Sequence, residues 1–143
     1  MCFYGKDYVN LVNGGRRAIE QLKIGDRIWS MTDNTNELIQ DEIIMMMHDG
    51  PNQPGLFYTF ETEQGYHLSL TETHTLPVLD SDDDQIKFLR ASKVTQKHRL
   101  LMFNQTIPIK TITYKPLIGY YSPITLSGYL FVNNISASCF SDR

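Results

Sequence analysis

The stretch GYHLSLTETHTLPVL, residues 65 to 79, sets a polar turn inside a run of strand-forming residues. Residues 67 to 70 alternate between polar and apolar side chains, which is typical of a half-buried β-strand. Thr71 and His74 follow at a spacing of three, and apolar residues then resume around Pro77. Because the first and fourth residues of a turn lie close together, this spacing allows the threonine and the histidine to act on one target.

The same strand pattern continues in both directions from that stretch. The predicted strands are rich in β-branched and aromatic residues, and clusters of Gly, Pro, Asn or Asp separate them. They are Tyr8 to Val12, Arg27 to Met31, Leu38 to Met47, Leu56 to Glu61, His67 to Leu70, Ile86 to Leu89, Leu100 to Phe103, Ile107 to Tyr114, Ile124 to Leu126 and Tyr129 to Val132. Only Arg17 to Leu22 and Leu89 to Val94 resemble helical turns, and each is too short for an independent helix. The sequence therefore predicts an all-β fold.

Composition limits the class of protein. Hydrophobic residues make up 41% of the 143 residues and charged residues 20%, which is typical of a single globular domain over residues 1 to 143. No window reaches the roughly 18 consecutive apolar residues that a membrane span needs. The net charge is -3 and the longest basic run is Arg16 with Arg17, so we expect no nucleic-acid partner. Nothing in the sequence indicates oligomerisation, and a monomer is expected.

Two segments of the chain resemble each other. LKIGDRIWSM begins at Leu22 and VTQKHRLLMF begins at Val94, and a possible helical turn precedes each. Both consist of an apolar residue, a three-residue turn, a polar residue, an arginine and further apolar residues. An internal duplication and an unrelated pair of β units both produce such a pattern. We expect Asp26 in the first segment and His98 in the second to have structural roles in turns.

No metal site is predicted. The loop DSDDD, Asp80 to Asp84, opens like a calcium loop, but Gln85 and Ala91 stand where that loop needs glycine and glutamate. The two cysteines, Cys2 and Cys139, lie near opposite ends of the chain, and there is no C-x-x-C pair. They are a reactive thiol, the two halves of an end-to-end bridge, or two small core residues.

A thiol at Cys2 has an electrophile in its own backbone, the carbonyl of the preceding peptide bond. Attack there passes through a five-membered ring and converts the amide into a thioester, which is an N-to-S acyl shift. The shift is uphill because amide resonance is lost, so the fold must stabilise the oxyanion and protonate the leaving nitrogen. An imidazole is a natural proton donor, and a hydroxyl can hydrogen-bond the same amide. His74 and Thr71 supply these groups.

Four motifs in this order resemble the Hint domain of hedgehog-type proteins, an autoprocessing module related to inteins. They are Cys2-Phe3, AIEQLKIGDRIWSM from Ala18, LSLTETHTLPV from Leu68 and VNNISASCF from Val132. The resemblance covers essentially the whole chain. It implies an all-β, horseshoe-like disk built from two pseudo-two-fold related subdomains, which would explain the internal match.

The resemblance also implies roles for individual residues. Cys2 matches the nucleophile, Thr71 and His74 match the pair that activates the scissile amide, and Cys139 matches the cysteine of the closing strand. Where the family has an acidic residue that activates the attacking alcohol, after DEIIMMM, this chain has His48 followed by Asp49. Either group can act as a base. If the two chain ends meet, as the family fold implies, Cys139 can also form a disulfide with Cys2 and mask the nucleophile.

In hedgehog proteins the 3β-hydroxyl of cholesterol then attacks the thioester and leaves the upstream signalling fragment esterified, within the secretory pathway. We therefore expect autocatalytic, cysteine-dependent cleavage in cis without a cofactor. The expected partners are an upstream signalling fragment and a sterol or another small nucleophile. The family's sterol-recognition segment has no counterpart before Arg143, and Met1 occupies the place of the family's pre-cleavage glycine.

Three other functions share some of these features. A splicing intein needs a C-terminal Asn, usually after His and before Cys, Ser or Thr, whereas Asn134 precedes Ile135 and no His-Asn pair occurs. A cysteine hydrolase that acts in trans usually presents its thiol at a helix N-terminus, whereas Cys2 precedes a predicted strand. A non-catalytic secreted β-rich module would bind its partner equally well after Cys2 is replaced by alanine.

Overall fold

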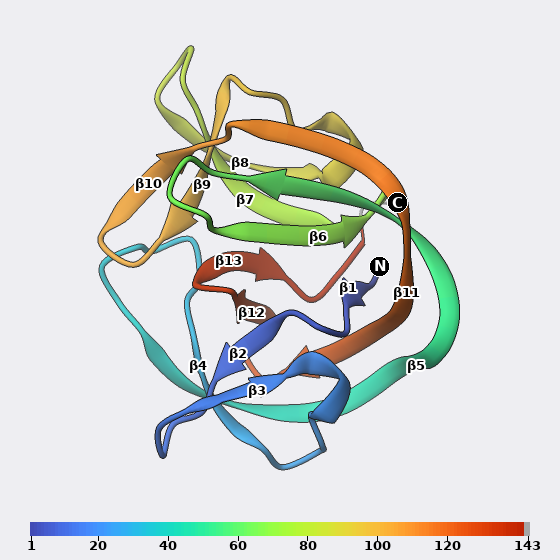
Figure 1. Cartoon of the computed structure of the whole chain (residues 1–143). Helices are drawn as coiled ribbons and strands as arrows, with labels where there is room; N and C mark the ends of the chain where they lie inside the picture. Colours follow the sequence, from blue (N-terminus) through green and yellow to red (C-terminus); the bar gives the residue numbers. More distant parts are fainter. Residues whose placement is uncertain (142–143) are drawn as a thin grey trace.

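Residues 1 to 141 are described by the computed structural model, which is built almost entirely from β-strands (Figure 1). The strands of the first half are β1 (Phe3–Tyr4), β2 (Tyr8–Asn10), β3 (Arg16–Ala18), β4 (Arg27–Ser30), β5 (Ile39–Glu61) and β6 (His67–Thr71). Those of the second half are β7 (Thr75–Asp80), β8 (Gln85–Arg90), β9 (His98–Met102), β10 (Gln105–Pro108), β11 (Thr111–Thr125), β12 (Tyr129–Val132) and β13 (Ile135–Ser138). The all-β prediction is confirmed.

Two short 3-10 turns, η1 (Ile19–Gln21) and η2 (Ala91–Lys93), interrupt the strands. Both fall within the segments that the sequence predicts to be helical turns. Across the described part of the chain, no helix has the length and apolar character needed to cross a membrane.

Two strands are longer than the sequence predicts. β5 continues through residues 48 to 55, and β11 fills the predicted gap between Tyr114 and Ile124. Prolines and glycines in these segments indicated loops, but the two segments pair with each other over most of their length, with three register shifts. Such shifts accommodate residues that interrupt the regular ladder. Four other strands, β1, β3, β7 and β13, are absent from the prediction.

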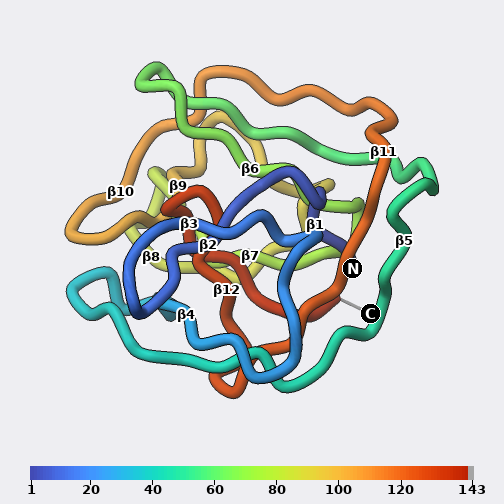
Figure 2. The backbone as a smooth tube through the Cα atoms, turned by 60° about the horizontal axis from the view of Figure 1, so that its bottom comes forward, coloured from blue at the N-terminus to red at the C-terminus, as the bar shows by residue number. Residues whose placement is uncertain are grey.

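β1 is one of four strands that pair in a closed ring. It pairs with β11 on one side and with β6 on the other, β6 pairs with β5, and β5 pairs with β11. Phe3 is opposite both Tyr121 and Leu70 and is fully buried. At Gly5, just after β1, a Cβ atom would lie 2.5 Å from the Tyr121 ring, so only glycine allows this close approach. The N-terminal strand is therefore held within the molecule (Figures 1 and 2), and Met1 and Ser141 line one cavity beside it.

β4 pairs with the first part of β5 at the edge of the sheet that contains this ring. The remaining strands form a four-stranded sheet in the order β10-β9-β7-β8 and two hairpins, β12–β13 and β2–β3. A common hydrophobic core joins these sheets to the ring. Its fully buried members come from both halves of the chain and include Phe3, Ile19, Ile28, Phe60, Leu68, Leu76, Leu100 and Leu130. The core thus fixes β1, β6 and β7, the three strands that carry or flank Cys2, Thr71 and His74.

The two similar segments form matching local structures, as a duplication would produce. After η1, a side-chain oxygen of Asp26 accepts a hydrogen bond from the amide of Lys23 at 2.9 Å. After η2, Nδ1 of His98 accepts one from the amide of Thr95, also at 2.9 Å. Asp26 and His98 therefore order equivalent turns, as the sequence predicts.

The repeat extends toward the N-terminal side of each 3-10 turn. Residues 4 to 7 and residues 71 to 74 each form a turn that is closed by a 3.1 Å hydrogen bond between the fourth amide and the first carbonyl. The Asp7 carbonyl then accepts the amide of Ile19 at 2.8 Å, as the His74 carbonyl accepts that of Ala91 at 2.8 Å. Asp7 and His74 are therefore equivalent positions in the two subdomains.

Candidate active site

The turn between β6 and β7 brings Thr71 and His74 together. Thr71 ends β6, and its carbonyl accepts the hydrogen bond from the His74 amide at 3.1 Å. The Thr71 amide in turn donates to the Cys2 carbonyl at 3.1 Å, which continues the pairing of β1 with β6. Strand pairing thus delivers the N-terminal cysteine to the turn that the sequence singles out. Of the predicted site residues, the structure brings together Cys2, Thr71 and His74.

The peptide bond between Met1 and Cys2 is hydrogen-bonded at both of its polar atoms. The Cys2 amide donates to Oγ1 of Thr71 at 2.8 Å. The Met1 carbonyl accepts a hydrogen bond from the hydroxyl of Ser122. Two hydroxyls therefore hold the amide that the Cys2 thiol would attack.

His74 is fully buried behind this peptide bond. Its Nε2 lies 2.7 Å from the Ser138 carbonyl, and its ring meets the ring of Phe3 edge to face with 4.3 Å between the centroids. A carbonyl can only accept, so Nε2 carries the proton and Nδ1 carries the lone pair. Nδ1 has no hydrogen-bond partner within residues 1 to 141.

Burial lowers the pKa of His74 to about 4 because the charged imidazolium loses its hydration. The Ser138 carbonyl opposes this effect, the charged amino terminus of the chain adds to it, and the backbone of Cys2 opposes it weakly. The imidazole is therefore neutral at pH 7, with a free lone pair at Nδ1. A buried base with a perturbed pKa and an unsatisfied nitrogen is characteristic of catalytic sites.

The Cys2 thiol is also buried, with only 7% of the residue exposed. Its Sγ lies 3.5 Å from Oγ of Ser122, the hydroxyl that bonds the Met1 carbonyl. Nothing in the sequence singles out Ser122, because a serine before a proline forms no distinctive motif. Strand pairing alone brings it to the site.

His48 and Asp49 lie further from the scissile bond, on β5. Both are exposed, and within the described residues neither has a recorded hydrogen bond to Cys2, Thr71 or His74. They stand at a register shift, where Met47 and His48 together oppose Ser122 of β11. The negative charge of Asp49 adds to the effect of burial in raising the pKa of Tyr121. The two residues therefore flank the site without touching the amide.

Cys139 is buried directly after β13. Its Sγ lies 3.5 Å from Oγ1 of Thr125, and burial raises the pKa of its thiol. Cys2 and Cys139 are both free thiols, so the bridge between them is not formed in this structure. Cys139 follows Ser138, whose carbonyl holds His74. Its observed surroundings are those of a core residue next to the site.

An open cavity of about 450 Å³ adjoins the scissile bond, and Met1 itself forms part of its wall. The other lining residues are Met47, Phe140 and Ser141, of which Met47 and Phe140 are half-exposed. The cavity therefore reaches the residue that carries the scissile carbonyl. Among residues 1 to 141, no cluster of three or more His, Cys, Asp or Glu side chains is placed to hold a metal ion.

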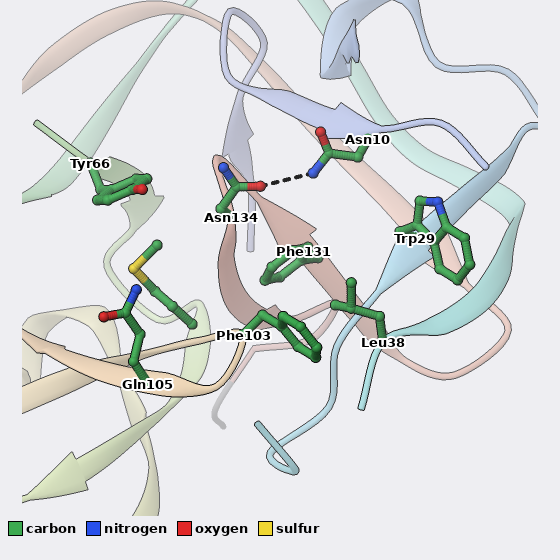
Figure 3. A pocket seen from close by; sticks show the side chains of 9 residues that line it. Asn10, Trp29, Leu38, Tyr66, Phe103, Gln105, Phe131 and Asn134 are labelled. Carbon is green, nitrogen blue, oxygen red and sulfur yellow. Dashed lines mark hydrogen bonds between the residues drawn. The ribbon is translucent and has the colours of Figure 1, made fainter. Parts of the chain in front are cut away.

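A second cavity, of about 360 Å³, lies between β2, β4, β10 and β12 (Figure 3). Aromatic side chains including Trp29, Tyr66 and Phe131 line it, and Asn10 donates a 2.9 Å hydrogen bond to Asn134 at its edge. None of Cys2, Thr71 and His74 contributes to its wall. It is separate from the chemistry of the scissile bond.

A family model and two hedgehog proteins match this chain over almost its whole length. The family model "Hint module" matches residues 1 to 142. The Tiggy-winkle hedgehog protein of Danio rerio is 32% identical over 148 residues, which cover 98% of this chain and 35% of that protein. Protein hedgehog of Drosophila yakuba is 27% identical over 149 residues, covering 98% of this chain and 31% of that protein. The chain thus spans about a third of the length of these relatives.

Solved structures with the same fold are inteins and intein-like domains. The DnaB intein from Synechocystis sp. PCC 6803 has a TM-score of 0.79 at 17% identity and covers 99% of both chains. The bacterial intein-like domain from Clostridium thermocellum has a TM-score of 0.75 at 17% identity, over 96% of this chain and 97% of that one. These structural likenesses establish the fold alone. The family match and the hedgehog relatives establish the family from sequence. The chain belongs to the Hint module family.

Proposed function

We propose that this chain breaks the peptide bond between residues 1 and 2 by forming an internal thioester at Cys2. The observation that carries the proposal is the arrangement around that bond: hydroxyls of Thr71 and Ser122 on its nitrogen and oxygen, with the thiol and the neutral imidazole of His74 buried beside it. Membership of the Hint family and the hedgehog relatives support autoprocessing as the function.

The first step is an isomerisation. The Cys2 sulfur forms a bond to the Met1 carbonyl carbon, and the carbonyl π electrons move to the oxygen. The electron pair on the oxygen then re-forms the carbonyl, the carbon–nitrogen bond breaks, and the nitrogen leaves with the electrons of that bond and takes up a proton. The proton that the thiol loses balances the proton that the nitrogen gains, so the step needs no oxidant, metal or cofactor.

His74 is suited to manage the proton in this step. The amide nitrogen of Cys2 is barely basic while it conjugates with the carbonyl, but it becomes an amine nitrogen once the carbon is tetrahedral. Nδ1 of His74 can take up a proton through its lone pair. It can then deliver that proton to the Cys2 nitrogen as this nitrogen becomes basic. Thr71 fixes the direction of the N–H bond meanwhile through its 2.8 Å hydrogen bond. Ser138 holds the ring by its opposite nitrogen.

A second nucleophile then attacks the thioester and releases the upstream fragment. The half-exposed Met47 and Phe140 give the adjoining cavity apolar walls, which suit a sterol or another lipid alcohol of the kind used by hedgehog-type proteins. His48 and Asp49 follow Met47 directly, and we assign to one of them the role of base for that alcohol. The relatives contain this region as part of a longer protein, which supports an upstream signalling fragment in cis and processing on the secretory route.

The splicing alternative assigns chemistry to an asparagine near the C-terminal end. Asn133 and Asn134 form the two-residue turn between β12 and β13, with φ of 50° and 67°. Asparagine tolerates this left-handed conformation better than most residues. The Asn133 side chain also bonds the Tyr8 amide and the His67 carbonyl. Both asparagines therefore have structural reasons to be present.

Cleavage of a fusion protein tests the proposed function. A soluble domain is joined ahead of Met1, with the bond between Met1 and Cys2 retained, and hydroxylamine or dithiothreitol is added. We expect a cut at this bond in the parent protein, no cut in Cys2→Ala, and a steep fall in rate in His74→Gln. His67→Gln is the matched control, because this exposed histidine begins the same strand, β6, and lies away from the amide. Cleavage that persists in Cys2→Ala, or a folded parent protein that does not cleave, would refute the proposal.

A further inference from the structure

We propose that Ser122 is a catalytic residue of the acyl shift, which donates its proton to the oxyanion and positions the attacking thiol. This inference rests on the proposed function and names a group that none of the recognised motifs contains. Ser122 is 1% exposed and contacts both the Met1 carbonyl oxygen and the Cys2 sulfur. It therefore touches the electrophile and the nucleophile at once.

The single proton and the two lone pairs of a hydroxyl determine which atom is the donor in each contact of Ser122. Ser122 has a single proton, and the Met1 carbonyl oxygen can only accept a hydrogen bond. The proton is therefore committed to the Met1 carbonyl. It follows that the 3.5 Å contact with sulfur has the Cys2 S–H as donor and the Ser122 oxygen as acceptor. One side chain thus holds the thiol close to the carbonyl group that it attacks.

The same hydrogen bond strengthens as the reaction proceeds. When the carbon–sulfur bond forms, negative charge moves onto the Met1 oxygen, and the proton of Ser122 already lies on that oxygen. A preformed and buried donor stabilises the developing charge without reorganisation. The Cys2 amide is held separately by Thr71, so the two hydroxyls act on different atoms of the scissile bond.

Neighbouring residues fix the position of Ser122. On its N-terminal side, Tyr121 is buried and packs against Gly5 just after β1. On its C-terminal side, Pro123 has a fixed backbone angle φ and is also buried. The register shift between these two residues sets Ser122 opposite the extra residue of β5. The serine is held between two buried neighbours on a paired strand, as a preorganised donor should be.

Single-turnover cleavage of the fusion described above tests this role. The first-order rate is measured at saturating hydroxylamine, where the acyl shift limits cleavage, and the melting temperature of each variant is measured in parallel. We expect Ser122→Ala to slow cleavage by about 10²-fold or more, as loss of an oxyanion donor does elsewhere. Ser122→Thr, which keeps the hydroxyl, should recover most of the rate. Ser136→Ala is the matched control, because Ser136 is a fully buried serine whose hydroxyl donates to the backbone carbonyls of Met31 and Thr32.

The outcomes separate the two proposals. If the parent protein cleaves and Ser122→Ala cleaves equally fast, Ser122 has no catalytic role while the proposed function stands. If Ser122→Ala and Ser136→Ala slow cleavage to the same extent, the loss reflects a weakened fold and the inference is overturned. If the folded parent protein fails to cleave, the proposed function fails and the inference falls with it. A loss of cleavage rate in Ser122→Ala but not in Ser136→Ala, with an unchanged melting temperature, supports the catalytic role of Ser122.

Discussion

Burial of His74 makes the stability of the fold depend on pH in a defined window. The histidine of an unfolded chain titrates near pH 6.5, whereas the folded-state pKa of His74 is about 4. Between these two values the unfolded chain binds a proton that the folded chain does not. The free energy of unfolding should therefore be fully maintained above pH 6.5, fall as the pH drops toward 4, and lose nothing further from this group below that.

The magnitude follows from the difference between the two pKa values. That difference is about 2.5, and each unit corresponds to about 1.36 kcal/mol, so His74 accounts for about 3 kcal/mol between pH 7 and pH 4. For a domain whose total stability is about 5–15 kcal/mol, this is a large share. His67 has the opposite sign, because its hydrogen bond to Asp7 raises its pKa. The contribution of His67 is present at low pH and is lost as the pH rises, and its exposure to solvent weakens it.

Urea unfolding at several pH values measures the effect. Cys2→Ala, which cannot form the thioester, is compared with Cys2→Ala carrying His74→Gln, because all other titrating groups are common to the two proteins. Relative to the variant that also carries His74→Gln, the Cys2→Ala protein should lose about 3 kcal/mol of unfolding free energy from pH 7.5 to pH 4. An NMR titration of His74 gives the pKa directly. A value of 6 or above in the folded protein, or a difference in stability that does not change with pH, would refute a neutral buried imidazole and with it the proton transfer proposed here.

Two further predictions concern residues around the site. Thr71→Val keeps the shape of the side chain but removes the acceptor for the Cys2 amide, so we expect cleavage at saturating hydroxylamine to slow by about 10-fold or more while stability changes by about 1 kcal/mol. Asn133→Ala removes hydrogen bonds to Tyr8 and His67 and places alanine at a φ of 50°, so urea unfolding should show a loss of about 2–3 kcal/mol. A loss smaller than 1 kcal/mol would mean that the Asn133 hydrogen bonds to Tyr8 and His67 contribute little to the stability of the fold.

The three central residues of the site each have a local chemical signal, but their meeting through the pairing of β1 with β6 was implied only by the family resemblance. The spacing between Thr71 and His74 corresponds to one hydrogen-bonded turn, and Cys2 carries its own electrophile in the preceding peptide bond. Ser122 could not be predicted in this way. It reaches the site because β11 pairs with both β1 and β5, and the sequence around it contains prolines that argue for a loop. A residue whose role depends on long-range pairing leaves no periodic signal in its neighbourhood.

The pseudo-two-fold repeat explains why only one of two equivalent turns carries the chemistry. Asp7 occupies the place of His74, both side chains are buried, and each leaves one polar atom without a hydrogen-bond partner in the described chain. Asp7 instead lies 3.4 Å from Nε2 of His67. The difference lies in the strand that each turn meets. The turn at Thr71 receives the Cys2 backbone, whereas the turn at residues 4 to 7 receives β11 through the hydrogen bond from Gly5 to Gly119. Residues 111 to 125 contain no cysteine, so the turn at residues 4 to 7 meets no peptide bond with a thiol beside it.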